Sequence, residues 1–578
     1  MEKLLHNIFS VRKAWLLPAL LLAGCACLKA QQPGQKPGPR PVYQTEGEKE
    51  AASKRIHILH ANYLSIEKMN DESVQKLIGN VRILQDSTYF YCDSAYHFEQ
   101  SNQLKAFGHV KVEMPDSVVL LANRMDYDGN EKVAYVYDDI VLTDHEVVLT
   151  TDRLVYYRLE RYGKYEDGGQ IKNEQDTLTS MTGYYYPDEH KAYFRENVDL
   201  KSPDYTLATD TLGYHTELKI AYFMSPTIIV SDDGEILATR GTYDSRYKKI
   251  ELFERSVVKD STYILTADSL FYTDSTNFGL ALGNIFIQQE DSSLEIRGNY
   301  GTFNRQTNES VVTQGAVAIQ YMDDDTLYMF ADTLYSRKDS NDNRIFRAYH
   351  HLSFYMNEMQ GKADSMVYFF TDSMMILYAD PVLWSDMNQL TGDTVRIWMK
   401  ASKADSMWVG RNSFMVGEED TVGYNQIKGK EMRAKFRDNQ LARLHVIGNS
   451  ESIYYNKNDE GHYEGMNECI AQEMIISLVD NEVRKIRFNA DPEGKYHPIH
   501  EVLFQEFQLD GMRWRIAERP LRPQPTSGGS FRPLFHGQNG PPELPPTTLP
   551  DSEAPNSIPQ TMPRLPGQGT DDTKEGSK

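Results

Sequence analysis

A short pattern recurs in this sequence at nearly constant spacing, and no other feature limits the possible folds as strongly. Its clearest form is A-D-S-L-x-Y, which occurs at residues 267–272 and, with one change, at 363–368. Successive copies lie 28 to 31 residues apart, which predicts a repeat architecture whose units contact mainly their neighbours. The second residues of the first copies are Asn62, Asp93, Asn123, Asp152, Thr182, Asp210, Thr239 and Asp268.

Each repeat holds two extended segments joined by turns. In residues 117–143, strict alternation puts Leu121, Met125 and Tyr127 on one side of the first segment. The Asp-Gly-Asn turn at 128–130 tolerates positive φ, so the chain can reverse into a second segment rich in Val, Tyr and Ile, which predicts a hairpin. A second type of segment, with a central break, recurs at 76–84, 105–114, 221–230, 280–288 and 311–320.

Composition then sets the structural class. The chain has 578 residues, of which 40% are apolar and 25% are charged, so it can bury a large core. Helix-period patterns are scarce, and Tyr, Val, Ile and Thr dominate the extended segments, so we expect an all-β protein built as an elongated, repetitive antiparallel stack. The net charge of −22 argues against nucleic acid or an anionic membrane surface as partner, because both select basic patches.

Residues 1–30 have the form of a bacterial export signal. Arg12 and Lys13 precede an apolar run that is short for a transmembrane helix. Two processing sites remain open: the sequence up to Cys25 has the form of a lipobox, which would leave Cys25 lipidated, whereas Ala30 fits ordinary signal cleavage. Both put the mature protein outside the cytoplasm.

The rest of the chain divides by composition. Residues 31–54 are rich in Pro, Gly, Gln and charge, and we expect a flexible spacer there. We expect β repeats over 55–400, followed by further β repeats and a C-terminal cap over 401–520. Residues 521–578 are rich in Pro and poor in large apolar groups, which predicts a disordered tail.

The large apolar residues of successive copies form one continuous surface if the repeats stack in register. Two interpretations remain open. These residues are the packed core of a closed stack, or two splayed sheets leave them lining a long apolar groove. Periodicity does not separate the two. The candidate lining residues are Leu121, Met125, Tyr127, Leu154, Tyr156, Leu212, Tyr214, Leu270, Tyr272, Met366 and Tyr368.

Signals for catalysis or metal binding are weak. Acidic residues are plentiful, but they recur at one position of each repeat, which indicates strand entry or turn chemistry rather than a catalytic pair. His497 and His500 are a poor metal signal, because Pro498 opposes the helix that would bring them together. The three aspartates at 323–325 fit a solvated turn better than a calcium site. We therefore expect no enzyme activity, no metal and no cofactor.

Several of these segments resemble a known family. The export signal, the roughly thirty-residue repeat and the segments at 76–87, 106–128 and 280–288 resemble the OstA/LptA family, the periplasmic β-jelly-roll proteins of lipopolysaccharide transport. Residues 424–455, followed by 489–499 and 509–520, are similar to the long OstA-like proteins of Bacteroidota. The resemblance covers roughly residues 55–520.

The resemblance implies a V-shaped stack of strands whose interior holds the acyl chains of lipid A, with the candidate residues as its lining. It implies a periplasmic location, where lipidation of Cys25 at the lipobox would tether the chain to the periplasmic face of the outer membrane. It also implies partners that add at the strand edges: further copies or other lipopolysaccharide-transport components. The chain is longer than the short bridge proteins and ends in a Pro-rich tail instead of a membrane barrel. The alternative function is a structural, adhesive or carbohydrate-binding β-solenoid of the cell envelope.

Overall fold

A computed structural model describes the chain from residue 56 to residue 536. All described residues belong to one unit, Met1–His536, and the second unit, Gly537–Lys578, lies outside them. The expected export signal with Cys25, the expected spacer and most of the expected tail also lie outside the described residues. Gaps in the description fall at 70–71, 86, 115–117, 145–146, 174–175, 187–188, 204, 233, 261–262, 323–324, 342, 401–402, 420–422, 438–439, 459, 480–481, 503–506 and 526–530.

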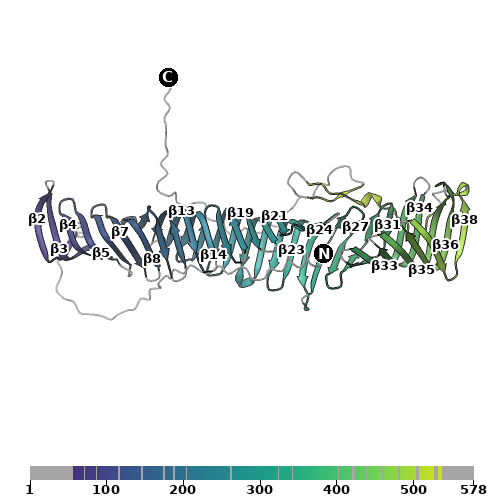
Figure 1. The fold of residues 1–578 in the computed structure, drawn as a ribbon, viewed down its shortest axis with the longest axis horizontal. Helices are drawn as coiled ribbons and strands as arrows, with labels where there is room; N and C mark the ends of the chain where they lie inside the picture. The colour runs from purple at the N-terminus through teal and green to yellow at the C-terminus, as the bar shows by residue number, and fades with distance from the viewer. Residues whose placement is uncertain are drawn as a thin grey trace, which may run out of the picture. The chain divides into compact units, whose positions relative to one another are not determined.

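Antiparallel strands make up nearly all of the described residues. Among these residues, 38 strands form one sheet, and neighbours in sequence pair along it, as β3 does with β4. Figure 1 shows the strands side by side along one long axis. The predicted all-β class and the elongated, repetitive antiparallel stack are confirmed. The first strands are β1 (His57–His60), β2 (Tyr63–Met69), β3 (Glu72–Gln85), β4 (Thr88–Phe98), β5 (Gln103–Glu113), β6 (Val119–Asp128), β7 (Val133–Asp144) and β8 (Val147–Tyr157).

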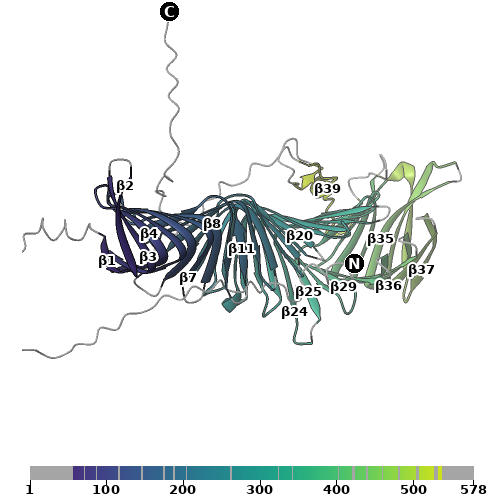
Figure 2. The same cartoon turned by 60° about the vertical axis from the view of Figure 1, so that its left-hand side comes forward.

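Each long strand bends once and contributes to two walls. Residues 74–78 of β3 pair with 94–98 of β4, and this half of each strand belongs to wall A. Residues 81–85 of β3 pair with 88–92 of β4, and this half belongs to wall B. Figure 2 shows the bent strands from the side. The walls therefore meet along a line of corners, and the turns between strands form a rim along the free edge of each wall.

In alternate strands of the sheet, those of the second segment type, two consecutive residues with left-handed backbone usually make the corner. At Gly79 and Asn80 the φ angles are 78° and 49°, and the pairing register shifts between Ile78 and Val81. Two such residues turn the strand without ending the sheet, as a β-bulge does. The central break predicted in the second type of segment is this corner. Further pairs are Gly108/His109, Asp138/Asp139, Glu196/Asn197, Glu254/Arg255, Gly283/Asn284, Gln314/Gly315, His350/His351, Ala379/Asp380, Arg411/Asn412, Gly448/Asn449 and Ala490/Asp491.

The second residue of a motif copy lies beside a corner and holds it. Oδ2 of Asp93 lies 2.7 Å from Nδ1 of His109, and Nδ2 of Asn284 donates to Oδ2 of Asp268 at 2.7 Å. A Cβ at Gly108 would clash with the Asp93 carboxylate, so the acid occupies the space that glycine leaves. The recurring acids therefore stabilise the corners, in line with their predicted turn chemistry.

A corner also changes which side chains face inward. In β6, Leu120 is buried before the corner, whereas Met125 and Tyr127 are buried after it. Leu121 is 44% exposed and lies on the opposite face from Leu120. The prediction that Leu121 shares one side with Met125 and Tyr127 is wrong, because strict alternation fails where the corner shifts the register.

Inward side chains of both walls form the core. Leu77 of wall A and Ile83 of wall B are fully buried in one cluster, and two further apolar clusters continue the core along the stack. The next strands are β9 (Tyr162–Tyr165), β10 (Gly169–Lys172), β11 (Thr177–Ser180), β12 (Thr182–Tyr186), β13 (Lys191–Lys201), β14 (Tyr205–His215), β15 (Ile220–Phe223), β16 (Thr227–Ser231), β17 (Gly234–Ala238), β18 (Arg240–Asp244), β19 (Lys249–Asp260), β20 (Tyr263–Thr273), β21 (Phe278–Gln289), β22 (Leu294–Asn304), β23 (Glu309–Tyr321) and β24 (Thr326–Lys338).

The remaining strands continue both walls to the end of the sheet. Short turns of 3-10 helix occur at η2 (Asp274–Thr276), η3 (Ile499–Glu501) and η4 (Ile516–Glu518). The strands are β25 (Arg344–Tyr349), β26 (Leu352–Tyr355), β27 (Gln360–Ala363), β28 (Ser365–Phe369), β29 (Met374–Tyr378), β30 (Val382–Ser385), β31 (Asn388–Thr391), β32 (Thr394–Lys400), β33 (Lys403–Glu419), β34 (Gly423–Arg437), β35 (Gln440–Lys457), β36 (Tyr463–Val479), β37 (Glu482–Asn489) and β38 (Glu493–Pro498).

Residues 507–525 and 531–536 cover part of the outer face of wall B, and we call them the strap. Val416 and Ile453 face away from the interior, yet both are buried because Leu509 and Trp514 of the strap belong to the same apolar cluster. Within the strap, β39 (Pro520–Leu521) pairs with β40 (Leu534–Phe535). Part of the segment expected to be a disordered tail therefore forms a strand pair.

Candidate functional site

An apolar cavity of about 140 Å³ lies between the walls at β19 to β23. Leu270 of wall A and Ile285 of wall B are among its lining residues. The wall A half of β21, at the centre of the cavity, has no fully buried residue, whereas the corresponding half of β5 has Leu104 and Ala106 buried. The walls therefore pack less completely here than near the start of the sheet.

The cavity exists because inward positions of wall A lack large side chains. Ala281 and Gly301 are cross-strand partners, and their row continues to Leu270 on one side and Val312 on the other. Gly279 lies in the next inward row. Because the neighbouring strands fix the position of the backbone, the missing side chains leave empty space instead of a closer approach of the walls.

The repeat pattern shows what has changed. Residues 298–303 (GNYGTF) form an altered copy of the motif, in which Gly301 takes the position of Leu270 in the preceding copy. Gly279 lies five residues before the second corner residue Asn284, and Leu104 holds the same position relative to His109. The cavity is therefore a local change in the repeat, at positions that carry larger side chains near the start of the sheet.

Arg305 and Ser310 are among the polar residues that line this apolar cavity, and both lie on its rim side. Arg305 is the only charged residue among those that line it in the described part of the chain. Ser310 also lines it, is 4% exposed, and its Oγ has no hydrogen-bond partner among the described residues. An unpaired buried hydroxyl costs free energy, so Ser310 is a candidate to bind a ligand atom.

Near the start of the sheet, the two rims are joined by hydrogen bonds. The Tyr127 hydroxyl of wall A donates to Oε1 of Gln85 of wall B at 2.5 Å, and Nη1 of Arg158 donates to the same oxygen at 3.2 Å. Gln85 is fully buried. We call these three residues the rim lock, because their bonds hold the walls together over a packed core.

Near the cavity, two positions that correspond to the rim lock make no such hydrogen bonds to the described residues. Gln289 follows its corner by the same number of residues as Gln85, but its Oε1 is buried with no hydrogen-bond partner among the described residues. Ser336 takes the tyrosine position of the motif copy that begins at Ala331, and its buried Oγ also lacks a partner there. At these two side chains, the bonds that the rim lock provides are not formed within the described part of the chain.

The structure places the predicted lining residues in four environments. Leu270 and Tyr272 line the cavity. Leu121 is exposed on the outer face, and Tyr156 is half-buried. The others are packed in the core clusters rather than along an open groove, and they are Met125, Tyr127, Leu154, Leu212, Tyr214, Met366 and Tyr368.

Other candidate sites do not assemble. In the described residues, no three or more His, Cys, Asp or Glu side chains gather as metal ligands. His497 and His500 each lie near a different glutamate, at 3.6 Å and 3.7 Å. Asp325 accepts a hydrogen bond from the Asn357 backbone at 3.0 Å, and the two preceding aspartates lie outside the description. The part of the chain that is described contains no helix long and apolar enough to span a membrane.

The strap is held through its backbone by buried glutamines of wall B. Gln389 donates from Nε2 to the Arg513 carbonyl at 2.7 Å and accepts from the Arg515 N–H at 2.7 Å. Gln426 makes the same pair of bonds farther along the strap, to the Phe507 carbonyl at 3.2 Å and from the Leu509 N–H at 2.8 Å. A side-chain amide here replaces the peptide group of a neighbouring strand.

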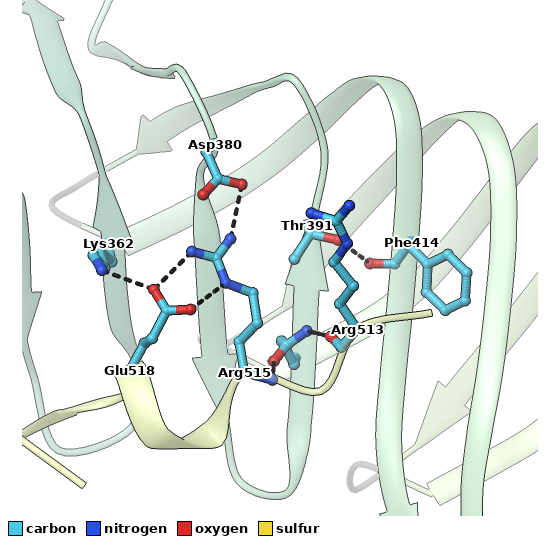
Figure 3. Close-up of polar contacts among 8 residues, drawn as sticks. Lys362, Asp380, Thr391, Phe414, Arg513, Arg515 and Glu518 are labelled. Atoms are coloured by element: carbon cyan, nitrogen blue, oxygen red, sulfur yellow. Dashed lines mark hydrogen bonds and ion pairs between the residues drawn. The ribbon is translucent and has the colours of Figure 1, made fainter. Parts of the chain in front are cut away.

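Charged side chains also attach the strap to wall B. Figure 3 shows Arg515 between Asp380 and Glu518, and Lys362 on the far side of Glu518. Hydrogen bonds from Arg515 and then Lys362 lower the pKa of Glu518 to about 2. The same acids raise the pKa of Arg515. The strap is therefore attached by a compact ion network as well as by apolar packing.

Comparison with known proteins identifies the first part of the sheet. A family model described as OstA-like protein matches residues 53–210. Residues 53–210 form an OstA-like region. This confirms the resemblance to OstA-like proteins over β1 to β13 and most of β14, whereas the cavity and the strap lie beyond the OstA-like region.

Two solved structures show limited similarity. LptH from Pseudomonas aeruginosa, the LptA homologous periplasmic component of its lipopolysaccharide transport device, is 13% identical, with a TM-score of 0.18 over 19% of this chain and 82% of LptH. The WD40 domain of SCAP from fission yeast is 8% identical, with a TM-score of 0.08 over 81% of this chain and 93% of that domain. No curated protein sequence matches the chain. Both TM-scores are low, so the fold assignment rests on the strand pairing.

Proposed function

We propose that this chain is a periplasmic lipopolysaccharide-binding component of outer-membrane assembly, which holds an acyl chain of lipid A between its walls. The apolar cavity at β19 to β23, in a sheet that begins with an OstA-like region, carries the proposal. Its volume of about 140 Å³ is near that of an apolar protein cavity of about 150 Å³ that binds benzene. The cavity is thus large enough for a segment of one acyl chain.

The chemistry is sequestration rather than catalysis. Each methylene that leaves water for the cavity contributes about 0.8 kcal/mol to binding. Among the predicted lining residues, Leu270 and Tyr272 are the ones that we assign to this contact. The corner acids, which are the most regular acidic residues of the sequence, are engaged in structural contacts such as that of Asp268 with Asn284, which supports a non-enzymatic role.

Location and partners complete the proposal. We propose export to the periplasm and lipidation at Cys25, which would tether the chain to the periplasmic face of the outer membrane. At the N-terminal end of the sheet, β2 exposes Tyr63 and Ile66, which are 74% and 65% exposed. Such an edge can accept a strand from another copy or from another lipopolysaccharide-transport component.

Direct binding tests the proposal. Full-length protein is titrated with labelled lipopolysaccharide, with lipid A and free polysaccharide as competitors. The variant Gly279→Leu adds a side chain whose Cβ would lie 3.6 Å or more from neighbouring atoms, so it fills the cavity without disturbing the backbone. Ala208→Leu adds the same side chain size at an exposed position of β14 and serves as the matched control.

Saturable binding that lipid A displaces, with an affinity at least about tenfold weaker in Gly279→Leu and unchanged in Ala208→Leu, is the expected result. Unchanged affinity in a folded Gly279→Leu variant would remove the cavity from the mechanism. Displacement by polysaccharide alone would instead support the second candidate, a carbohydrate-binding or structural β-solenoid. The packed core beneath the rim lock is the observation that favours this candidate.

A further inference from the structure

The cavity is chemically asymmetric. Its walls are apolar, with Leu270, Ile285 and Val312 among the lining residues, and its only charged lining residue in the described chain is Arg305. Arg305 lies in the rim turn between β22 and β23, immediately after the last residue of β22. A ligand that is only a hydrocarbon gains no binding energy from a cation at this position. The asymmetry therefore indicates a ligand with one apolar end and one anionic end.

Arg305 is held in place by its backbone while its guanidinium stays available. The Arg305 N–H donates to the carbonyl of Asn277 in the adjacent rim turn at 2.8 Å. No described residue forms an ion pair or side-chain hydrogen bond with its guanidinium. A planar guanidinium with free N–H groups suits a phosphate or carboxylate, which it can bind through two parallel hydrogen bonds.

The rim lock shows what an arginine at this position otherwise does. Arg158 stands two residues after Tyr156, the last residue of its motif copy, as Arg305 stands two residues after Phe303. Arg158 is engaged with Gln85 and thereby closes the rims. At the cavity the same position carries an arginine without such a bond, so its charge is free for a ligand.

Ser310 supplies a second polar contact beside Arg305. It pairs with Phe303 across the two strands, directly below the turn that carries Arg305. Its Oγ is buried and has no hydrogen-bond partner among the described residues. A buried hydroxyl at the same end of the cavity as the arginine extends the polar end into a small, two-residue site.

We propose that the cavity binds an anionic amphiphile in one orientation, with its hydrocarbon end among Leu270 and Ile285 and its phosphate or carboxylate at Arg305 and Ser310. This inference rests on the proposed function, because it assumes that the cavity takes a hydrocarbon chain. It adds the class of head group and the residues that select it.

Charge-matched probes test the orientation in the full-length protein. Dodecyl phosphate and the neutral dodecyl maltoside are titrated calorimetrically below their micelle concentrations into the wild type, Arg305→Gln and Arg305→Lys. Arg246→Gln is the matched control, because Arg246 lies in another turn of the same rim and pairs with Asp244 instead of facing the cavity. We expect Arg305→Gln to weaken dodecyl phosphate binding about tenfold, Arg305→Lys to restore most of it, and dodecyl maltoside to bind all variants equally.

Ser310→Ala gives an independent readout. It is expected to weaken dodecyl phosphate binding a few-fold while the melting temperature stays the same or rises, because the substitution removes an unpaired buried hydroxyl. If Ser310 had only a structural role, Ser310→Ala would lower both the affinity for dodecyl phosphate and the melting temperature. Inorganic phosphate is expected not to displace dodecyl phosphate, and displacement would overturn the inference by revealing an anion site that needs no hydrocarbon.

The remaining outcomes separate the inference from the proposed function. If both dodecyl probes bind but Arg305→Gln weakens neither, or weakens both equally, the head-group assignment is wrong and the hydrocarbon cavity stands. If neither probe binds the wild type, and lipopolysaccharide also fails to bind, the proposed function itself is wrong.

Discussion

The OstA-like region and the centre of the sheet are built from the same repeat, yet one is closed and the other is hollow. In the OstA-like region, Leu104 and Met125 fill the space between the walls and the rim lock joins the rims. At β19 to β23, Gly279 and Gly301 leave a cavity, and the lock is incomplete. A small number of side chains therefore decides whether a repeat of this stack has a packed core or a binding cavity.

Introducing a charge into each region gives the largest expected difference. Leu154→Asp puts a carboxylate into the closed core and is expected to cost about 4 kcal/mol or more, enough to unfold the region. Leu270→Asp puts it beside a cavity, where fewer apolar atoms are packed against the side chain, so we expect a smaller cost, a folded protein and impaired lipid binding. Denaturant unfolding followed by circular dichroism measures both. Equal losses of stability would contradict the contrast between the regions.

Removing one bond of the rim lock gives the next largest effect. Tyr127→Phe deletes the hydroxyl that donates to Gln85 and is expected to cost about 1 to 2 kcal/mol, because both groups are buried. Lipid affinity should not change, since the cavity is far away in sequence and has its own lining. Thermal unfolding and lipid titration of the same sample check this, and a loss of lipid affinity would show that the lock and the cavity are coupled.

Two buried serines provide a finer comparison. Ser336 at the incomplete lock has an unpaired hydroxyl, whereas the Ser413 hydroxyl donates to the Gly429 carbonyl at 2.9 Å. Ser336→Ala is therefore expected to leave stability unchanged or raise it by about 1 kcal/mol, and Ser413→Ala to lower it by about 1 kcal/mol. Melting temperatures of the two variants decide the matter. A loss in Ser336→Ala equal to that in Ser413→Ala would mean that the Ser336 hydroxyl is satisfied.

Acid provides the smallest and most local change. The pKa of Glu518 is about 2, below its ordinary value of 4.5, so its contribution is present above pH 4.5 and is lost as the pH falls toward 2. We expect the strap to become sensitive to an acid-active protease in that range, while the OstA-like region, which has no strap, keeps its hydrogen-exchange protection. Glu518→Gln should release the strap at neutral pH and remove most of the pH dependence. A strap that is equally protected at pH 5 and pH 2.5 would argue against this role.

Much of the fold can be predicted from the sequence because the repeat dictates it. The spacing of Asp93, Asn123 and Asp152 predicts the repeats, and the sequence shows the central break at Gly79 and Asn80, but only the structure shows that this break is a corner. The inward face of Leu121 was predicted incorrectly, because a pattern of period two takes no account of the register shift at a corner. The structure thus corrects the prediction from the sequence at positions where a corner interrupts the alternation of inward and outward side chains.

The cavity was only partly predictable. Leu270 and Tyr272 follow from the motif, but Gly301 required the altered copy at 298–303 to be recognised as a copy despite its missing leucine. Arg305 gives no signal in the sequence, since its meaning depends on having no partner in the folded rim. The glutamines that bind the strap were also missed, because their partners lie about a hundred residues away and the bonds go to backbone atoms.

The strap has a consequence for the order in which the protein matures. The ribosome makes the strap after all 38 strands of the sheet that the structure describes. Until the strap docks, the outer face of wall B presents Trp384, Val416 and Ile453 to solvent, which are all nearly fully buried in the finished protein. A chain that is truncated before residue 507 keeps this apolar face exposed. Chaperones and proteases act on exposed apolar surface, so they can distinguish the truncated chain from the finished protein.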